Sequence, residues 1–208
     1  RIKKLKSITG LSLPKTSIHS SFMQRIKVII PAYNEQDSIG FVVKDIPQIV
    51  DEIIVVNNNS TDNTVAVALA AGATVLTEKR GGYGYACLKG IDYINRLETK
   101  PDIVVFLDGD YSDYPEELLQ IVAPIQNETA AFVVGARVKE LRAPGSMTPQ
   151  QVFGNWLACF LMKIFYQSKF NDLGPFRGIR WDTLVSLNMS DKTYGWTVEM
   201  QLKILQKA

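Results

Sequence analysis

The sequence contains very little histidine and cysteine, and this scarcity excludes several kinds of chemistry. Among the 208 residues, the only histidine is His19, and the only cysteines are Cys87 and Cys159, which stand far apart. A zinc centre or a disulfide framework would need more ligands at closer spacing. Because no histidine follows residue 19, acid–base or metal chemistry in the rest of the chain must use carboxylates. We expect both cysteines to be buried free thiols in a reducing compartment.

Long apolar runs are also absent, and neither sign of charge dominates. No run reaches the ~20 residues of a membrane span, and residues 1–22 lack the apolar core and cleavage site of a secretory signal. The formal net charge is +2, but residues 1–22 carry basic residues and no acid, which leaves a mildly acidic body. A nucleic-acid partner is therefore not expected, because it would require a basic face.

The two ends of the sequence raise separate questions. We expect residues 1–22 to be a basic leader outside the fold, either disordered or left over from upstream sequence, with Met23 as the natural start. The alternative is a native arm that contacts anionic lipid. Residues 23–208 are expected to form one domain. Residues 201–208 have a helical pattern without a stop signal, so whether the natural chain continues past Ala208 stays open.

From Ile26 onward, apolar runs alternate with helical patterns. The apolar runs predict strands at residues 27–30, 52–56, 73–76, 102–107 and 130–134. The helical patterns between them lie at residues 37–48, 62–71, 85–96 and 115–126, and further helices follow from about residue 150. Apolar strands separated by helices are typical of an α/β, Rossmann-like fold with a mostly parallel central sheet and helices on both faces. Ligands of such sheets bind at the carboxyl ends of the strands.

Two aspartates follow the strongest strand pattern. Asp108 and Asp110 are separated by Gly109, which allows a sharp turn and the close approach of a ligand. Two carboxylates on one turn can bind a single Mg²⁺ or Mn²⁺ ion. The alternative interpretation is a solvated turn before the helix that begins at Pro115.

Two further polar segments follow predicted strands. Asn57, Asn58 and Asn59 are more than one helix cap requires, and their amides could pair with a nucleobase edge. Residues 79–84, with the sequence Lys-Arg-Gly-Gly-Tyr-Gly, precede a helix and could bind an anion through backbone N–H groups. They match neither the dinucleotide fingerprint nor the P-loop, so a plain tight turn explains them equally well.

Together these segments resemble the family 2 glycosyltransferases with a GT-A fold. The resemblance rests on residues 28–35, 55–64, 80–84 and 106–110. Within this family the chain looks most like the dolichyl-phosphate mannose synthase group, which has counterparts of residues 135–137, 174–177 and 194–199. The resemblance implies a nucleotide-sugar-binding half at residues 23–137 and an acceptor-side half at residues 138–208.

The resemblance also implies roles for individual residues. Those implied to bind the nucleotide sugar are Pro31, Ala32, Tyr33, Glu35, Asn57, Asn58, Arg80, Gly81, Gly84, Asp108 and Gly109. Asp108 and Asp110 would hold Mg²⁺ or Mn²⁺, with Ser112 as the candidate third ligand where the mannose synthases often have Gln. Arg137 and Arg177 would bind phosphate groups of the donor or the acceptor. Asn58 would face the base, and because the family more often has Asp there, the identity of the base stays open.

The activity that the resemblance implies is an inverting, metal-dependent transfer of a hexose from a UDP- or GDP-linked donor to a polyprenyl (dolichyl or undecaprenyl) phosphate. A phosphate acceptor needs no strong base, because its second pKa is about 6 and it is already anionic near neutral pH. A hydroxyl acceptor would need a carboxylate base, for which Glu199 and Asp172 are the candidates. Glu199 is about as well explained as a charge at a helix N-terminus.

Residues 152–166 are apolar almost all round. A helix of this kind is buried, packs in a dimer, or lies at a membrane surface. Composition alone slightly favours the buried or dimeric helix. The resemblance favours the membrane surface, and it implies a cytoplasmic protein that is peripheral at the inner face of the membrane. A homodimer stays open.

Other functions were weighed against this interpretation. The first is a glycosyltransferase for a hydroxyl of a cell-surface glycan. A sugar-nucleotide pyrophosphorylase would have a Gly-rich basic loop where this chain has residues 31–35, and a phosphatase would have its Asp-x-Asp on the first strand. A non-catalytic nucleotide-sugar-binding domain would have no need of both Asp108 and Asp110.

Overall fold

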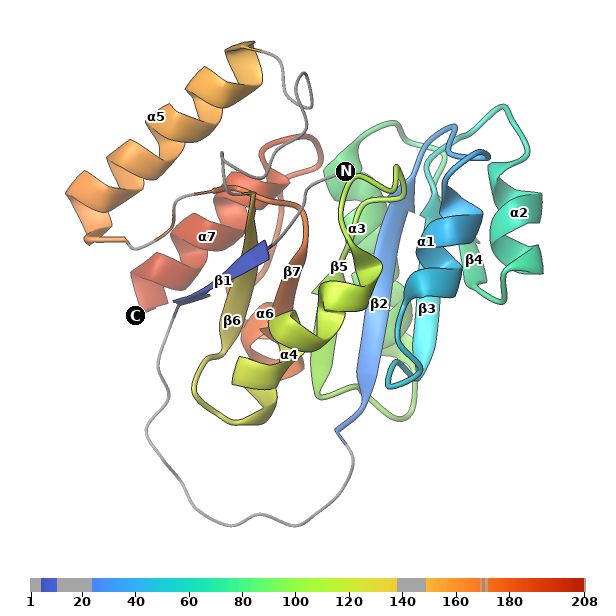
Figure 1. The fold of residues 1–208 in the computed structure, drawn as a ribbon, viewed down its shortest axis with the longest axis horizontal. Coiled ribbons are helices and arrows are strands. Elements are labelled where there is room, and N and C mark those ends of the chain that lie inside the picture. Colours follow the sequence, from blue (N-terminus) through green and yellow to red (C-terminus); the bar gives the residue numbers. More distant parts are fainter. Residues whose placement is uncertain (1–4, 11–23, 138–148, 169, 171, 208) are drawn as a thin grey trace.

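The computed structural model describes residues 5–10, 24–137, 149–168, 170 and 172–207 (Figure 1). Its centre is a seven-stranded sheet with the strand order β1-β6-β7-β5-β2-β3-β4. The strands are β1 (Leu5–Gly10), β2 (Ile26–Ala32), β3 (Glu52–Asn57), β4 (Thr74–Thr77), β5 (Ile103–Phe106), β6 (Phe132–Arg137) and β7 (Arg177–Arg180). All five strands predicted from apolar runs are present, as β2 to β6.

The predicted strands all run in one direction. β2 pairs in parallel with β3 and β5, and β3 pairs in parallel with β4. β7 is antiparallel to both of its neighbours, β5 and β6, so β6 has the same direction as β5. The sequence did not predict β7, because Arg-Gly-Ile-Arg lacks an apolar run, yet its first three residues are buried. The α/β prediction is confirmed, with antiparallel strands added on one side of the sheet.

Part of the basic leader belongs to the sheet, which corrects the expectation that residues 1–22 lie outside the fold. Strand β1 pairs antiparallel with β6, from Leu5 opposite Arg137 to Gly10 opposite Phe132. Without β1, one side of β6 would present a row of backbone N–H and C=O groups to solvent. Pairing along this edge explains why a short polar segment adopts an extended conformation.

Helices cover both faces of the sheet (Figure 1). They are α1 (Ile39–Asp45), α2 (Thr64–Ala70), α3 (Tyr83–Arg96), α4 (Leu118–Gln126), α5 (Pro149–Tyr166), α6 (Trp181–Leu187) and α7 (Trp196–Lys207), with a 3₁₀ turn, η1 (Pro115–Glu117), before α4. Successive residues of a strand point to opposite faces. Accordingly, Val28 and Ile30 of β2 pack in the cluster with α1, α2 and α4, whereas Ile29 packs in the cluster with α3, α6 and α7.

Both cysteines are buried free thiols, as expected. Burial raises the pKa of the Cys87 thiol well above its usual value and raises the pKa of Cys159 to about 11. The predicted apolar helix is present as α5, which packs against α7 at one side of the molecule (Figure 1). Within the described residues, none of the helices combines the length and the apolar character that crossing a bilayer requires.

Candidate active site

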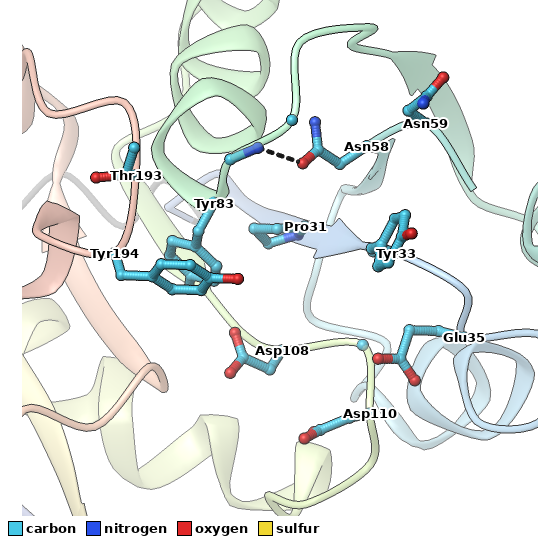
Figure 2. Close-up of a pocket in the computed structure, with 14 residues that line it drawn as sticks. Pro31, Tyr33, Glu35, Asn58, Asn59, Tyr83, Asp108, Asp110, Thr193 and Tyr194 are labelled. Carbon is cyan, nitrogen blue, oxygen red and sulfur yellow. Dashed lines mark hydrogen bonds between the residues drawn. The ribbon is translucent and has the colours of Figure 1, made fainter. Parts of the chain in front are cut away.

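A cavity of about 580 Å³ lies at the carboxyl ends of β2, β3 and β5 (Figure 2). In the sheet, β3 and β4 lie on one side of β2 and β5 lies on the other, so the order of the strands reverses at β2. Ligands of open α/β sheets bind at such a point of reversal. The predicted residues that line the cavity are Pro31, Ala32, Tyr33, Glu35, Asn58, Gly81, Asp108, Gly109 and Asp110. Three further lining residues, Asn59, Gly82 and Tyr83, belong to segments that the sequence indicated for binding, whereas Thr193 and Tyr194 were assigned no role.

The loops after β2 and β3 are joined to each other by hydrogen bonds. The N–H of Asn34 donates to Ser60 Oγ at 3.0 Å, and the N–H of Thr61 donates to Asn34 Oδ1 at 2.8 Å. The N–H of Glu35 donates to Thr64 Oγ1 at 2.8 Å. These cross-links hold one wall of the cavity, on which Tyr33 is 60% exposed.

Three carboxylates line the cavity: Glu35, Asp108 and Asp110. Among the residues that the structure describes, no lysine or arginine lines it. Burial raises the pKa of Glu35, which the charges of Asp110 and Asp62 raise further, while a hydrogen bond from Ser38 Oγ at 2.7 Å opposes the shift. The charged side chains that line the cavity are therefore all acidic, which favours a cation and disfavours an anion bound alone.

Oxygen atoms are the ligands that Mg²⁺ and Mn²⁺ prefer, so the Asp108–Asp110 turn fits such an ion. In the described part of the chain, no group of three His, Cys, Asp or Glu side chains lies close enough to hold a metal by itself. Ser112 does not line the cavity, and its backbone N–H donates to Asp110 Oδ1 at 2.9 Å. An ion at this turn would therefore need further ligands from a substrate or from water.

Asn58 lines the cavity, but its side-chain amide is engaged within the protein. Its Nδ2 donates to the carbonyl oxygens of Glu78 at 3.3 Å and Arg80 at 2.7 Å, and its Oδ1 accepts from the N–H of Gly82 at 2.8 Å (Figure 2). Asn57 does not line the cavity, and its Oδ1 accepts from the N–H of Ser60 at 2.9 Å. Asn58 thus fastens the 78–82 loop to the end of β3.

The glycine-rich turn before α3 is better described as a tight turn than as an anion site. The N–H groups of Gly84 and Tyr85 donate to the carbonyl oxygens of Thr193 and Lys192, both at 3.1 Å. Arg80 lies outside the cavity lining, because its guanidinium makes two hydrogen bonds of 2.8 Å to Glu78. Gly84 also lies outside the lining, under the backbone of Asp191 and Lys192.

Glu199 does not line the cavity and is fully engaged in hydrogen bonds. Its carboxylate accepts from the N–H and hydroxyl of Ser190 and from the N–H of Asp191, at 2.8 to 3.2 Å. It also forms an ion pair with Lys203 at 2.8 Å. Burial alone would raise the pKa of Glu199, but these contacts outweigh it and lower the pKa. Of the two interpretations given above, this geometry favours the structural one over a general base.

Arg177 and Asp172 are not among the residues that line the cavity, although the charge of Arg177 interacts with that of the lining residue Asp108. Arg177 is fully buried and donates to the carbonyl oxygens of Leu173, Gly174 and Thr197. Asp172 is also buried, and its backbone carbonyl accepts from Gln201 Nε2 at 2.9 Å. Arg137 ends β6, and its side chain lies outside the described part of the structure. Phosphate binding by Arg177 would therefore require this buried side chain to leave its carbonyl partners.

Thr193 and Tyr194 line the cavity, although sequence reasoning assigned them no role. Tyr194 begins the segment 194–199 on which the resemblance partly rests, and Thr193 lies directly before it, but only Glu199 was selected from this segment. They reach the cavity because α7 packs beside α3 on one face of the sheet. Long-range packing, which no local pattern encodes, therefore brings residues of the acceptor-side half to the donor side.

Comparison with known proteins agrees with this architecture. The family model described as Glycosyl transferase family 2 matches residues 27–190. An uncharacterised glycosyltransferase of Mycobacterium bovis is 31% identical over 180 residues, which cover 86% of this chain and 78% of the relative. The UDP-N-acetylglucosamine–dolichyl-phosphate N-acetylglucosaminyltransferase of Methanococcus voltae is 28% identical over 149 residues, which cover 62% of this chain and 59% of the relative.

Solved structures share the fold. The glucosyl-3-phosphoglycerate synthase of Mycobacterium tuberculosis superposes with a TM-score of 0.66 and 24% identity, over 88% of this chain and 67% of that one. Another structure of that enzyme contains Mn²⁺, UDP-glucose and glycerol 3-phosphate, and matches with the same TM-score and identity over 88% of this chain and 66% of that one. The chain spans about two thirds of the length of the solved structures that it matches.

Proposed function

The chain belongs to glycosyl transferase family 2, and we propose that it transfers a hexose from a UDP- or GDP-linked sugar to an acceptor that carries a phosphate. One observation carries this proposal: the cavity at the strand ends is lined by three carboxylates and, among the described residues, by no lysine or arginine. A nucleoside diphosphate is strongly anionic, so it would be repelled there unless a divalent cation joined it to the protein.

In this proposal Asp108 and Asp110 hold Mg²⁺ or Mn²⁺, and the diphosphate supplies further ligands. When bound, the ion offsets the negative charge that develops as the nucleoside diphosphate leaves. The loops after β2 and β3, with Pro31 and Tyr33, hold the nucleoside in the orientation that the family resemblance implies. The acceptor oxygen then attacks the anomeric carbon in a single displacement with inversion of configuration.

A polyprenyl phosphate is our preferred acceptor. The Methanococcus voltae relative is named as a transferase for dolichyl phosphate. Helix α5 exposes a group of apolar side chains that suits the surface of a lipid bilayer: Phe153, Trp156, Leu157, Phe160, Leu161, Ile164 and Phe165. We propose that this group, the α5 patch, brings the protein to the cytoplasmic face of the membrane. A phosphate acceptor also explains the absence of a free carboxylate base at Glu199.

A soluble phosphate is the second candidate acceptor. The glucosyl-3-phosphoglycerate synthase of Mycolicibacterium paratuberculosis is 34% identical over 113 residues, which cover 48% of this chain and 33% of the relative. The shared fold leads to the same candidate. 3-Phosphoglycerate carries a hydroxyl group as well as a phosphate. Transfer to its phosphate oxygen would follow the chemistry above, whereas transfer to its hydroxyl would need a base that removes the hydroxyl proton.

The test measures release of the nucleoside diphosphate from UDP-glucose, UDP-N-acetylglucosamine and GDP-mannose with Mn²⁺, with either undecaprenyl phosphate in detergent or 3-phosphoglycerate as the acceptor. We expect turnover with one donor, stimulation by the lipid phosphate, and loss of activity when EDTA removes the metal. Asp110→Asn should lower the rate at least about 100-fold, because it removes a charged ligand.

The matched control is Asp92→Asn, which alters an exposed aspartate that pairs with Arg96 on α3. This variant should keep the wild-type rate. Full activity of Asp110→Asn, or equal rates with Mn²⁺ and with EDTA, would contradict the metal assignment. Stimulation by 3-phosphoglycerate but not by undecaprenyl phosphate would replace the preferred acceptor with the soluble one.

A further inference from the structure

Tyr194 occupies an unusual position for a side chain at the edge of a site. It lines the cavity and is still 87% exposed, so its ring has space for a ligand to pack against it. In Figure 2, Thr193 and Tyr194 lie across the cavity from Tyr33 and Glu35, and the carboxylates of Asp108 and Asp110 lie between the two sides. The cavity therefore has an aromatic residue at each end, with Asp108 and Asp110 between them and Glu35 on the same side as Tyr33.

This order matches the order of groups in a nucleotide sugar, which are nucleoside, diphosphate and sugar. The proposed function places the nucleoside beside Tyr33 and the diphosphate at Asp108 and Asp110, and the present inference rests on that placement. The sugar then extends toward Tyr194. We propose that Tyr194 contacts the transferred sugar, and that Glu199 is the positioning residue that holds the segment carrying Tyr194.

The hydrogen bonds of Glu199 show how the segment is held. Its carboxylate binds the backbone N–H groups of Ser190 and Asp191, at the start of the segment from residue 190 to residue 195. Asp191 Oδ1 in turn accepts from the N–H of Thr193 at 2.8 Å. Lys203, the ion-pair partner of Glu199, also donates to the carbonyl oxygen of Asn188 at 2.7 Å. The Glu199 carboxylate thus binds both the beginning of the segment and the side chain of Lys203.

The glycine turn before α3 supports the other side of the segment. Gly84 and Tyr85 donate the two backbone hydrogen bonds described above. In addition, the segment packs so closely on the turn that Gly82 and Gly84 have no room for a side chain. A Cβ atom on Gly82 would clash with the carbonyl oxygen of Lys192, and one on Gly84 would clash with that of Asp191. Gly82 also has a φ of +143°, a conformation that other residues rarely adopt. The glycines therefore form a seat for the backbone of residues 191–193.

The contacts of Glu199 are consistent with a positioning role and not with general-base catalysis. A general base must reach the acceptor proton directly or through one water molecule. The Glu199 oxygens instead accept from Ser190, Asp191 and Lys203, and Glu199 does not line the cavity. Its effect on the reaction must pass through the segment that it holds, which places Thr193 and Tyr194 at the cavity.

The first experiment measures the dissociation constants of UDP, UDP-glucose, UDP-N-acetylglucosamine, GDP and GDP-mannose by calorimetry in the presence of Mn²⁺. For the tightest-binding sugar nucleotide, Tyr194→Ala should weaken binding about tenfold, which is the size of one lost aromatic contact. Binding of the corresponding nucleoside diphosphate should change by less than about twofold. Tyr194→Phe keeps the ring and should retain most of the affinity for the sugar nucleotide.

The second experiment concerns Glu199. Glu199→Gln replaces one acceptor oxygen by an amide NH₂ group that faces N–H donors, so it should weaken sugar-nucleotide binding in the same selective way as Tyr194→Ala. The double variant should be little worse than either single variant, because the two act as one unit. The pH–rate profile should keep its shape in Glu199→Gln. Glu98→Gln, at an exposed glutamate after α3, is the control and should match the wild type.

Several results would overturn the inference. One is an unchanged ratio of sugar-nucleotide to nucleoside-diphosphate affinity in Tyr194→Ala, or a wild type that gains no affinity from any sugar. Another is strict additivity of the two substitutions. A loss of at least about 100-fold in Glu199→Gln with the disappearance of one limb of the pH profile would show a general base instead. If the wild type bound neither UDP nor GDP with Mn²⁺, the proposed function would fail first, and this inference with it.

Discussion

The amide of Asn58 makes three hydrogen bonds to the loop that follows β4, and two of them need the amide as a donor. A carboxylate at this position could not donate to the carbonyl oxygens of Glu78 and Arg80, and its charge would face both of them. The family resemblance, by contrast, assigns this position to the nucleobase and more often places Asp there. The hydrogen bonds and the family resemblance therefore predict different effects for a mutation of Asn58.

We expect Asn58→Asp to weaken UDP and GDP binding in the presence of Mn²⁺ by the same factor, about tenfold, because the loss of the loop contacts costs on the order of 1–3 kcal/mol. Calorimetry with both nucleotides measures the ratio of the two affinities, which should not change. Asn95→Asp is the matched control, since Asn95 is an exposed asparagine on α3 that does not line the cavity. A selective gain for UDP in Asn58→Asp would show that this residue reads the base.

Glu78 gives a prediction about pH. The two hydrogen bonds from Arg80 lower the pKa of this nearly buried carboxyl from 4.5 to about 2. A carboxyl whose pKa is lower in the folded than in the unfolded state stabilises the protein above the unfolded pKa. This contribution is complete above pH 4.5 and is lost as the pH falls from 4.5 to about 2.

The urea midpoint of Glu78→Gln should therefore lie below that of the wild type at neutral pH and approach it as the pH falls through this range. The difference between the two proteins isolates Glu78, because other carboxyls with lowered pKa values, such as Glu52 and Asp182, titrate in both. Glu98→Gln, at an exposed site, should show no such convergence. A constant difference at every pH would contradict the assigned pKa.

At the level of elements, helix α5 is the most exposed apolar helix of the described structure. Cys159 and Met162 are buried on one side of it, whereas Trp156 and Phe160 stack at 5.3 Å between ring centroids and are both largely exposed. The helix therefore contacts the protein along a narrow stripe, and the α5 patch covers much of the rest. The sequence predicted the helix but could not show which side would be covered.

We expect Trp156→Ser combined with Phe160→Ser to lower binding to anionic phospholipid vesicles about tenfold or more, because two aromatic side chains no longer enter the interface. Vesicle sedimentation measures this partition. The control is Phe41→Ser, which removes an aromatic side chain of similar exposure on α1. Unchanged vesicle binding would exclude the α5 patch as a lipid contact, and concentration-dependent dimers that the double variant abolishes would assign the patch to a second copy of the chain.

Prediction from the sequence succeeded for elements with a strong local pattern. The strands β2 to β6 are apolar runs, and the turns after β2 and β5 are local in the chain, so Pro31, Glu35, Asp108 and Asp110 could be placed correctly at the cavity. It failed for β7, where Gly178 occupies a position at which a Cβ atom would crowd Ile121 of α4. That glycine reflects packing against a helix far away in the sequence, which a local reading cannot detect.

At the scale of the whole molecule, the division into a donor half and an acceptor half does not follow the sheet. Strand β7 comes from the acceptor-side half but lies between β5 and β6 of the donor half. Thr193 and Tyr194 likewise come from the acceptor side and line the donor cavity. The motif around Arg177 suggested a phosphate ligand, but it could not show that this strand lies inside the sheet. In the structure, the Arg177 side chain is buried and binds backbone carbonyl oxygens.

The place of β7 in the sheet also has a consequence for how the protein is made. While the chain emerges from the ribosome, β5 and β6 are synthesised well before residues 177–180, yet each has β7 as a neighbour. Until those residues arrive, both nascent strands carry an open backbone edge that can pair with another chain. Translation must therefore proceed almost to the end of the described sequence before the middle of the sheet can close, and this interval is when the newly made protein is most exposed to aggregation.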